Sequence, residues 1–525
     1  MVTTLRSPNL LVDPPADTGV SGDELKALLG DRRIIFASNR GPVQYALGGR
    51  HELTPKRGQG ALVTSLTSLL RYARVTWVAS CMSAGDREAA RRQKCAAQAS
   101  LLEESLRLRM VQVPARAYKR HYQIFANPIL WFIHHSLAGQ LLTKPASQVK
   151  EAWRWGYMPV NRAMAAAILD ELAHPDTVPW VFIHDYHLYL TGHYVRQRAP
   201  LALLLHFVHI PWPAPGEGLL RLGPLWREVL HGLLSNDIIG FQIANHARNF
   251  LLDCRLSLPG VQVDPSNGVV YYRGRAVRVR VYPISVDVQA LREDASSLPV
   301  LTYRRRLESL CAEKTMVLVE RVDPSKNTLE SLMAFRQLLE SNPGLAGRVT
   351  LLAFLVPSRT AIPEYRRYGQ RLMACVKSIN ERFGTDGYQP IHVFYENNYY
   401  QALAGMGLYD VLLVNPVADG MNLVAKEGPI VNQRDGVLVL SEGAGAHAQL
   451  SAGSLSVRVG DVDGVVRAMY QALCLPQEER RRRASLLRNT IEKEDLTQWL
   501  FRQIKDITLL DAERRPVGQE AMTNC

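Results

Sequence analysis

Short runs of apolar residues recur along this chain, and most are followed by polar residues and then by an amphipathic segment. The first half holds five such runs, at 31–38, 76–79, 178–183, 201–208 and 237–241. The second half holds another five, at 316–319, 349–356, 391–395, 411–414 and 437–440. Runs without a polar face predict parallel strands that are covered by helices on both sides. We therefore predict an α/β fold with doubly wound parallel sheets.

The alternation of strands and helices is interrupted between about 284 and 299, where Ser, Asp and Pro replace the apolar pattern, and then begins again. This interruption predicts a boundary between two domains, in keeping with a chain of 525 residues. The charged stretch 86–109 is predicted to be helical. The predicted segments are a flexible arm at 1–30, a first domain at 31–290, a second at 291–485, and a final helix and polar tail at 486–525 that pack back on the first domain.

The chain has a formal charge of +13, with one basic cluster at 478–488. That cluster has no interleaved aromatic residues and belongs to no nucleic-acid-binding module, so a solvated helix face is favoured and no nucleic-acid partner is expected. Excess positive charge suits anionic substrates such as sugar phosphates and sugar nucleotides.

Seven cysteines occur without CxxC or ligand-like spacing, which indicates reduced thiols and no structural metal. The N-terminus lacks the basic-then-apolar order of a signal peptide, and no stretch has the length of a membrane span. The sequence therefore predicts a cytoplasmic protein with no membrane partner, no metal and no cofactor.

Polar residues follow several of the predicted strands of the first domain. Asn39 and Arg40 follow the first, Asp185 follows the strand at 178–183, and His209 follows the strand at 201–208. Ligands of parallel sheets bind beyond the carboxyl ends of the strands. One such histidine is more often a satisfied core residue, but several polar groups at one sheet edge predict a site.

The stretch 414–446 has the parts of an anion site. A buried strand ends at Val414, a turn containing Asp419 and Gly420 follows, and a helix is predicted to begin at Met421. The first N–H groups of a helix lack partners within the helix and attract phosphate. This arrangement is common in α/β proteins, so on its own it is weak evidence.

Nine motifs, taken together, carry a resemblance to a known family. In order they are SNRGP, YQIFANPILW, FIHDYHL, FVHIPWP, IIGFQIANHARNFL, VYPISVD, VERVDPSKN, VPSR and DGMNLVAKE. The chain resembles the trehalose-6-phosphate synthase family, family 20 of the retaining glycosyltransferases, from about Ile34 to Phe501. The resemblance implies the GT-B fold, in which two Rossmann-like domains face each other across a cleft.

The resemblance implies a donor site for a sugar nucleotide in the second domain. Arg321 and Lys326 would hold the diphosphate and stabilise the charge that develops on it as it leaves. Glu427 would accept the ribose hydroxyls. The donor-binding residues implied are Gly60, Arg321, Lys326, Asp419, Gly420, Met421, Asn422, Leu423, Val424 and Glu427.

The resemblance also implies an acceptor site for a phosphorylated sugar, most simply glucose 6-phosphate, with trehalose 6-phosphate as product. Arginine holds a phosphate through two parallel hydrogen bonds. The acceptor-binding residues implied are Arg40, Tyr122, Trp131, Asp185 and Arg359. His209 would contact the donor sugar. The catalytic residues implied are Asp185, His209, Arg321 and Lys326, with no metal.

The family's mechanism implies retention of configuration without a covalent intermediate. The departing diphosphate takes the proton of the acceptor hydroxyl, which attacks the same face of the sugar. Catalysis then rests on positioning and on stabilising the leaving group. The partners implied are UDP-, GDP- or ADP-glucose and a phosphorylated acceptor, and a homo-oligomer is compatible with the sequence.

The chain departs from the family pattern at four places. Its segment 79–82 lacks the usual tryptophan, Ala61 replaces the second glycine of the N-terminal loop, Ala418 replaces the usual arginine, and Trp155 replaces an acidic residue. Glycerol 3-phosphate or an (amino)cyclitol phosphate, as used by pseudo-glycosyltransferases, is therefore an alternative acceptor. A third alternative is a non-catalytic regulatory homologue, which the retained donor residues disfavour.

Overall fold

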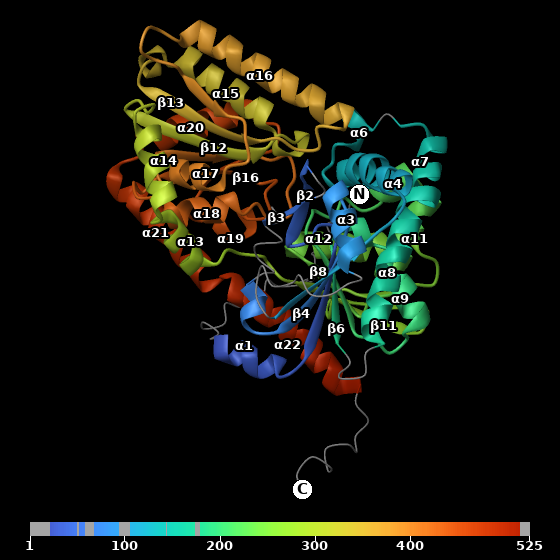
Figure 1. Ribbon diagram of the computed structural model, residues 1–525. Coiled ribbons are helices and arrows are strands. Elements are labelled where there is room, and N and C mark those ends of the chain that lie inside the picture. The colour runs from blue at the N-terminus through green and yellow to red at the C-terminus, as the bar shows by residue number, and fades with distance from the viewer. Residues whose placement is uncertain are drawn as a thin grey trace, which may run out of the picture. The chain divides into compact units, whose positions relative to one another are not determined.

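The computed structural model describes residues 22–49, 52–57, 68–93, 105–142, 144–173 and 179–514 (Figure 1). The chain divides into two compact units. Unit 1 takes its described residues from Met1–His134, Leu142–Pro283 and Thr497–Cys525, and unit 2 takes its own from His135–Leu141 and Ile284–Leu496. Within the described ranges, no helix is long and apolar enough to cross a bilayer.

Unit 1 is built on a nine-stranded sheet in the order β5-β4-β1-β6-β7-β8-β11-β10-β9. All neighbours from β5 to β11 run parallel, and β10 and β9 extend the sheet antiparallel. The strands are β1 (Arg33–Ser38), β4 (Arg74–Ser80), β5 (Leu106–Val111), β6 (Trp180–His184), β7 (Leu204–Val208), β8 (Ile238–Phe241), β9 (Gln262–Asp264), β10 (Val269–Tyr272) and β11 (Arg275–Val281).

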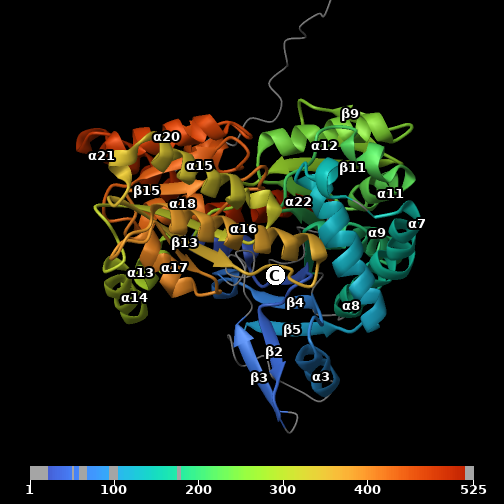
Figure 2. The same ribbon diagram turned by 90° about the horizontal axis from the view of Figure 1, so that it is seen from above.

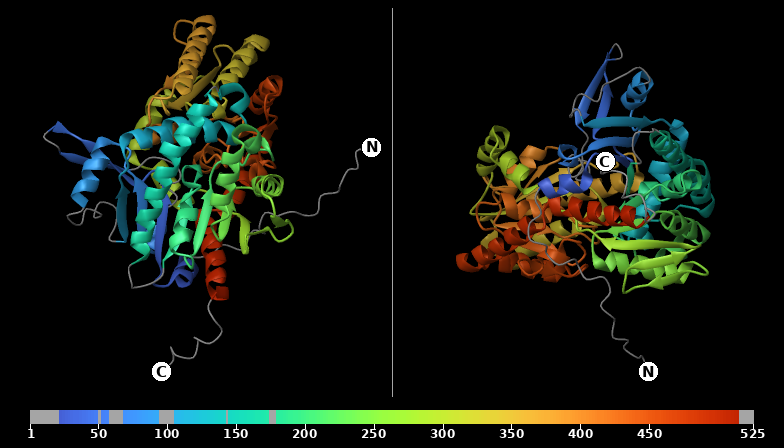
Figure 3. Two further views of the ribbon diagram at one scale, coloured as in Figure 1. Left: turned by 90° about the vertical axis from the view of Figure 1, so that its right-hand side faces the viewer. Right: turned by 90° about the horizontal axis from the view of Figure 1, so that it is seen from below.

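Different helices cover the two faces of this sheet. Alternate residues of β1 and β6, such as Ile35 and Val181, pack with Val160 and Ile168 of helix α8 (Met158–Leu172). On the opposite face, Trp499 of α22 (Leu496–Arg514; red in Figure 3) packs edge-on against Phe207 of β7, with ring centroids 5.6 Å apart. The apolar runs therefore form strands that are buried on both faces, as the pattern predicted.

The prediction of a continuous helix over 86–109 is wrong. Helix α3 spans Ala84–Gln93, and residues 106–111 form the edge strand β5, which pairs parallel with β4. Leu106, Leu108 and Met110 are buried, whereas Arg107 and Arg109 are exposed. This alternation with a period of two is the signature of a half-buried strand, and the charged composition concealed it.

The other elements of unit 1 surround this sheet. Strands β2 (Val43–Leu47) and β3 (Leu53–Arg57) form a separate antiparallel hairpin, which lies beside α3 (Figure 2). The remaining helices are α1 (Gly22–Leu29), η2 (Ser68–Arg71), α4 (Ala115–Lys119), η3 (Arg120–Leu130), α5 (Trp131–His134), α7 (Ala146–Ala152), η4 (Trp153–Tyr157), η5 (Tyr186–Leu188), α9 (Thr191–Arg198), α10 (Glu217–Leu222), α11 (Pro224–Leu233) and α12 (Ala244–Ser257).

Unit 2 is a six-stranded parallel sheet in the order β14-β13-β12-β15-β16-β17. Its strands are β12 (Lys314–Arg321), β13 (Val349–Val356), β14 (Ile391–Phe394), β15 (Val411–Val414), β16 (Val437–Ser441) and β17 (Leu455–Val457). The five longer strands coincide with the five apolar runs of the second half. Its core joins Met316 and Leu351 of the sheet to Phe335 of α15 (Thr328–Ser341) and Met469 of α20 (Val462–Cys474).

Two layers of helices enclose the sheet of unit 2. Helices α15, α16 and α20 lie together on one face, and α17 and α18 lie on the other (Figure 1). The helices are α6 (Ala138–Leu141), α13 (Val288–Ala295), α14 (Leu298–Glu308), η6 (Pro324–Lys326), α15 (Thr328–Ser341), η7 (Pro343–Leu345), α16 (Pro363–Phe383), α17 (Tyr399–Met406), α18 (Val424–Val431), α19 (His447–Leu450), α20 (Val462–Cys474) and α21 (Gln477–Lys493).

Candidate active site

The sheet of each unit contains one point at which the direction of winding reverses. In unit 1 the chain builds outward from β1 to β4 and β5, and then returns to the other side of β1 with β6. In unit 2 it builds from β12 to β13 and β14 and returns beside β12 with β15. Ligands of doubly wound sheets bind beyond the carboxyl ends of the strands at such a switch point. Most of the site residues predicted from the sequence follow the strands at these two points.

Cations and carboxylates gather at the switch point of unit 2. Arg321 is the last residue of β12 and is exposed, and Lys326 ends the short helix η6 that follows. The ammonium group of Lys326 donates a hydrogen bond of 2.5 Å to the carboxylate of Asp419, beyond β15. It also lies 3.5 Å from a carboxylate oxygen of Glu320. The pairing of β12 with β15 thus joins three predicted site residues to Glu320, which the sequence analysis missed.

The charges of this cluster are strongly coupled. Burial alone would raise the pKa of Asp419, but the nearby cations, Lys326 foremost, together outweigh burial and lower that pKa below its ordinary value. Burial alone would lower the pKa of Lys326, but Asp419 and Glu320 raise it. For Glu320 burial prevails, and its pKa is raised to about 7. An ionised Lys326–Asp419 pair therefore stands beside a glutamate that titrates near neutral pH.

The turn after β15 is held against the loop that follows β16. The N–H of Asp419 donates to the carbonyl of Gly443 at 2.8 Å, and the N–H of Gly445 donates back to the carbonyl of Asp419 at 3.1 Å. A Cβ on Gly445 would lie 1.9 Å from the carbonyl oxygen of Gly420, so only glycine permits this approach. Backbone hydrogen bonds thus fix the turn after β15.

The helix after this turn begins at Val424, three residues later than the sequence predicted. Asn422 has a φ of 77°, which breaks the helical path. Its side-chain amide donates to Asp419 at 3.1 Å, and its side-chain oxygen accepts from the N–H of Ala425 at 3.3 Å. Met421 and Leu423 accordingly lie in the turn, and the predicted set 419–424 spans a turn and one helical residue.

Two charged residues lie in the first turns of α18. Burial raises the pKa of Glu427, the predicted ribose ligand, to about 7. Lys426 is fully buried, and its ammonium donates to the carbonyl of Ile284 at 2.8 Å. Lys426 therefore ties α18 to the first residue of the second sequence segment of unit 2.

Arg359, predicted to bind the acceptor phosphate, follows β13 in unit 2. Its guanidinium forms a 2.6 Å ion pair with Asp323 and donates to the hydroxyl of Tyr365 at 2.8 Å. Both charged side chains are buried, at 7% and 0% exposure. Burial raises the pKa of Asp323, but Arg359, Arg321 and the other groups around it together outweigh burial and lower that pKa. The backbone of Arg359 has a φ of 48°, a strained conformation of the kind found at functional sites.

Arg40 and Tyr122, predicted acceptor ligands, lie together in unit 1. Arg40 follows β1, and its guanidinium is 3.5 Å from the hydroxyl of Tyr122 in η3. Tyr122 stacks on Tyr118 with ring centroids 5.7 Å apart. Trp131, the third ligand predicted from η3 and α5, is only 4% exposed and packs against Tyr186. Arg40 and Tyr122 thus offer polar atoms at the sheet edge, whereas Trp131 is buried.

Asp185 follows β6, the strand next to β1. Its backbone has a φ of 74°, unusual for a residue other than glycine, and its N–H donates to the carbonyl of Phe207 at 2.8 Å. The side chain is half-buried. A strained backbone at the carboxyl end of a switch-point strand is a common mark of a functional position.

His209 belongs to a cluster of neutral histidines behind this edge. Burial lowers the pKa of His209 and of His206 to about 3, and that of His184 also lies well below its ordinary value. Nδ1 of His184 lies 3.1 Å from Nε2 of His209, and the side-chain amide of Gln242 lies 3.5 Å from Nδ1 of His209. Both ring nitrogens of His209 thus have neighbours inside unit 1. His184 was missed because a histidine at the end of an apolar run carries no pattern of its own.

Three of the four departures from the family pattern lie among the described residues, and Ala418 is half-buried in the turn before Asp419. Ser80, in the segment without a tryptophan, is buried, and its hydroxyl lies 3.7 Å from the sulfur of Met164 in α8. Trp155 is 55% exposed, with the guanidinium of Arg154 over its ring. Gly60 and Ala61 lie outside the described residues. No group of three or more potential metal ligands is found in the part of the chain that the structure describes.

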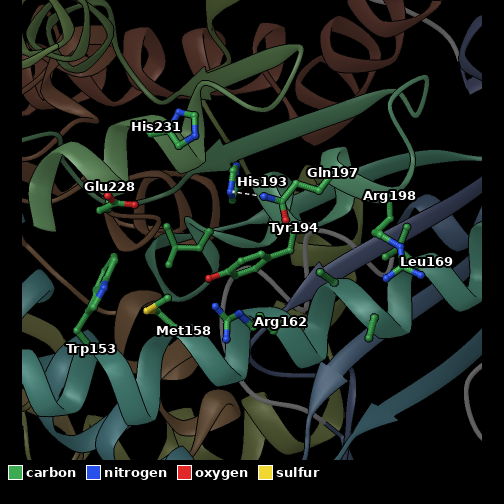
Figure 4. A pocket seen from close by; sticks show the side chains of 13 residues that line it. Trp153, Met158, Arg162, Leu169, His193, Tyr194, Gln197, Arg198, Glu228 and His231 are labelled. Carbon is green, nitrogen blue, oxygen red and sulfur yellow. Dashed lines mark hydrogen bonds between the residues drawn. The ribbon is translucent and has the colours of Figure 1, made fainter. Parts of the chain in front are cut away.

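A cavity of about 470 Å³ lies between helices α8, α9 and α11 of unit 1 (Figure 4). Figure 4 shows Trp153, Met158 and Arg162 along one side, with His193 and Tyr194 of α9 across from them. It lies among helices on one face of the sheet, and none of the predicted site residues lines it. The cavity is therefore separate from the candidate active site.

The basic cluster on α21 is largely neutralised within unit 2. Arg480 is buried against Asp410 at 3.1 Å, Arg488 pairs with Asp435 at 3.2 Å, and two further arginines pair with Glu479. The interpretation as a solvated helix face holds for only part of the cluster, because Arg480 anchors the helix to the sheet.

The paired charges at the switch point of unit 2 occur in a chain that has known relatives. The sequence profile described as glycosyltransferase family 20 matches residues 32–508. This chain belongs to glycosyltransferase family 20. The resemblance stated from the sequence is thereby confirmed.

Relatives and solved structures share the family and the fold. The chain is 29% identical over 495 residues to alpha,alpha-trehalose-phosphate synthase [UDP-forming] A of Dictyostelium discoideum, covering 94% of this chain and 63% of that protein. It is 26% identical to a trehalose-6-phosphate protein from E. coli bound with UDP-2-fluoro glucose, with a TM-score of 0.76 and coverage of 91% and 99%. It is 27% identical to an alpha,alpha-trehalose-phosphate synthase from Burkholderia xenovorans in complex with glucose-6-phosphate. The TM-score is 0.76, and the match covers 91% of this chain and 99% of that chain. These matches confirm two Rossmann-like domains of the GT-B type.

Proposed function

We propose that this protein is a retaining glucosyltransferase that moves glucose from a sugar nucleotide to glucose 6-phosphate and so forms trehalose 6-phosphate. The observation that carries the proposal is the cluster of Arg321, Lys326 and Asp419 at the switch point of unit 2 in a chain of this family. The related structures contain UDP-2-fluoro glucose and glucose 6-phosphate. The chain spans about 63% of the length of the Dictyostelium relative.

The donor half would act on the leaving group. Lys326 is charged because its pKa is raised, and Arg321 is exposed at the end of β12. Two cations beside a diphosphate stabilise the negative charge that grows as the glycosidic bond breaks. The turn 419–424 would hold the sugar and diphosphate through backbone groups, and Glu427 would accept hydrogen bonds from the ribose. Gly60, outside the described residues, would border the same ligand.

The acceptor half would position a sugar phosphate. Arg40 and Tyr122 offer a guanidinium and a hydroxyl for the phosphate, and Asp185 would hydrogen-bond the reacting hydroxyl region. Arg359 is a phosphate ligand in this proposal despite its ion pair with Asp323, because a guanidinium has five donors and can serve both groups. His209, neutral in the structure, would contact the donor sugar.

Retention then follows from front-face attack. The acceptor hydroxyl forms the new bond to the anomeric carbon as the bond to the diphosphate breaks, and its proton passes to the diphosphate oxygen. The enzyme contributes position and charge stabilisation rather than a nucleophile.

A second acceptor is favoured by one specific observation. In the segment 79–82, Ser80 is buried and contacts Met164 in the core, so no aromatic or exposed polar side chain replaces the family's usual tryptophan at this point. Such a segment suits an acceptor that makes fewer contacts there, such as glycerol 3-phosphate or a cyclitol phosphate.

A cytoplasmic location and a homo-oligomeric state stay predictions.

The experiment is a product-detected screen of the purified protein. UDP-, GDP- and ADP-glucose would each be paired with glucose 6-phosphate, glycerol 3-phosphate and a cyclitol phosphate. We expect trehalose 6-phosphate from one or more donors, with a matched K326A variant as the inactive control. Transfer to another acceptor alone would establish the second candidate. Absence of product from all nine pairs would refute the proposed function.

A further inference from the structure

Glu320 lies in a setting that the donor chemistry described above does not use. It occupies an apolar parallel strand, and its side chain is 3% exposed. One carboxylate oxygen is 3.5 Å from the ammonium of Lys326, and the other is buried without a hydrogen-bond partner among the described residues. A buried polar atom without a partner costs free energy, so its retention needs a physical reason.

We propose that Glu320 is a positioning residue that shares the ammonium of Lys326 with Asp419 in the free protein and takes up a proton when the diphosphate of a sugar nucleotide binds. This inference rests on the proposed donor site. The step is a simple addition: the Glu320 carboxylate gains a proton from solvent and becomes a carboxylic acid, while the diphosphate stays ionised.

Charge balance motivates this step. The charged groups that act on Glu320 are Lys326, Asp419 and Arg321. With both carboxylates ionised, these four groups sum to zero. A bound diphosphate would add negative charge beside Lys326 and Arg321, in a region where burial already disfavours charge. Protonation of one carboxylate relieves the repulsion and leaves the ammonium of Lys326 more available to the diphosphate.

Geometry selects Glu320 rather than Asp419 as the proton acceptor. Asp419 is 2.5 Å from the ammonium and also accepts from the Asn422 amide at 3.1 Å, and both contacts stabilise its charged form. Among the described residues, the carboxylate of Glu320 has only the 3.5 Å contact with that ammonium. The pKa shifts agree with this choice, because the pKa of Asp419 is lowered whereas that of Glu320 is raised to about 7.

The test is isothermal titration calorimetry with UDP-glucose, GDP-glucose and ADP-glucose at pH 7, without acceptor. These donors are esterified at both ends of the diphosphate and do not titrate near neutral pH. Repeating each titration in PIPES, HEPES and Tris, whose ionisation enthalpies differ, gives the number of protons taken up. With a pKa of about 7, about half of Glu320 is ionised at pH 7, so the wild type should take up as much as about half a proton more than E320Q.

Two variants control the comparison. E364Q removes another buried carboxyl of unit 2, outside the proposed site, and should take up protons as the wild type does. E320D keeps a titratable carboxyl and should retain uptake. Glu427 would release protons on donor binding rather than take them up, because ribose hydroxyls favour its charged form. The difference in proton uptake between the wild type and E320Q is therefore the decisive quantity.

The outcomes separate this inference from the proposed function. Binding with equal proton uptake in the wild type and E320Q overturns the role of Glu320 and leaves the donor site intact. Failure of all three donors to bind overturns both. If E320Q does not unfold cooperatively, difference infrared spectra of the wild type and E320D decide: donor binding should produce a protonated-carboxyl band that E320D shifts, and absence of the band overturns the inference.

Discussion

The switch points of the two units share a topology but differ in charge. In unit 2, Lys326 and Arg359 each form a short ion pair with a buried or half-buried carboxylate. In unit 1, the corresponding edge carries histidines with lowered pKa values, tyrosine hydroxyls and the exposed Arg40. The same strand order therefore supports two kinds of chemistry, because the residues just past the strands are free to vary while the buried runs maintain the sheet.

The difference matches the needs of a transfer reaction. Charge develops on a leaving diphosphate, so the donor half requires cations whose positions are fixed in advance. A neutral acceptor hydroxyl requires hydrogen-bonding groups and an orientation rather than a strong field. In the proposed function, the paired cations of unit 2 would serve the leaving group, and the groups at the edge of unit 1 would serve the acceptor.

The largest effect is expected for Lys326. K326A should lower kcat/KM about 10³-fold, equivalent to about 4 kcal/mol, because the stabilisation of the leaving group is lost. Steady-state kinetics with the active donor would measure it. K377A, which removes an exposed lysine from α16, is the matched control and should retain full activity. Near-normal turnover by K326A would show that Lys326 does not stabilise the leaving group.

Arg359 should matter for stability as well as for binding. R359A removes the ion-pair partner of the buried Asp323, which should lower the free energy of unfolding by about 3 kcal/mol. Urea denaturation at pH 7 would measure this. D323N combined with R359A should recover much of the loss, since the buried charge is removed. A fully stable R359A protein would show that the ion pair between Arg359 and Asp323 does not stabilise the fold.

Glu320 should make stability depend on pH. Its pKa rises from 4.5 to about 7 on folding, so the folded state binds more protons than the unfolded state between these values. Stability therefore falls as pH rises from about 4.5 to 7, by up to roughly 3 kcal/mol from this group. Denaturation at pH 5 and pH 7.5 should show a smaller decline for E320Q than for the wild type. Equal declines would contradict the raised pKa.

A smaller effect is expected at the edge of unit 1. R40A should raise the apparent KM for the acceptor about tenfold, because an exposed phosphate contact is lost, and should leave the KM for the donor and the stability nearly unchanged. Comparing R40A with R359A contrasts the loss of an exposed arginine with the loss of a buried one. Equal changes in both KM values would mean that Arg40 does not distinguish the two substrates.

The sheet cores could be predicted from the sequence because burial on both faces leaves long apolar runs. The ten runs all correspond to strands, and the α/β class is confirmed. The missed strands are those that burial does not mark in this way. β5 and β11 alternate with arginines, β2 and β3 form a separate hairpin, and β9, β10 and β17 are short or lie at an edge. Their existence depends on partners that are distant in sequence.

The site was only partly predictable for a related reason. Arg321, Lys326 and Asp419 stood out through the family motifs, yet nothing in the order of residues indicated that Glu320 lies 3.5 Å from Lys326 or that Asp323 holds Arg359. A carboxylate within an apolar run, as in KTMVLVER, was the available signal for Glu320. The positive φ of Asn422, which delays the start of α18, likewise arises from the surrounding loop rather than from local propensity.

The most direct test of the central claim is proton NMR of the product formed from glucose 6-phosphate and the active nucleotide-glucose. The account predicts an α,α-1,1-linked disaccharide phosphate, formed by the wild type and almost absent with K326A. An inverted linkage, or the same rate of formation with K326A, would contradict a transfer in which the fixed cations of unit 2 stabilise the leaving diphosphate.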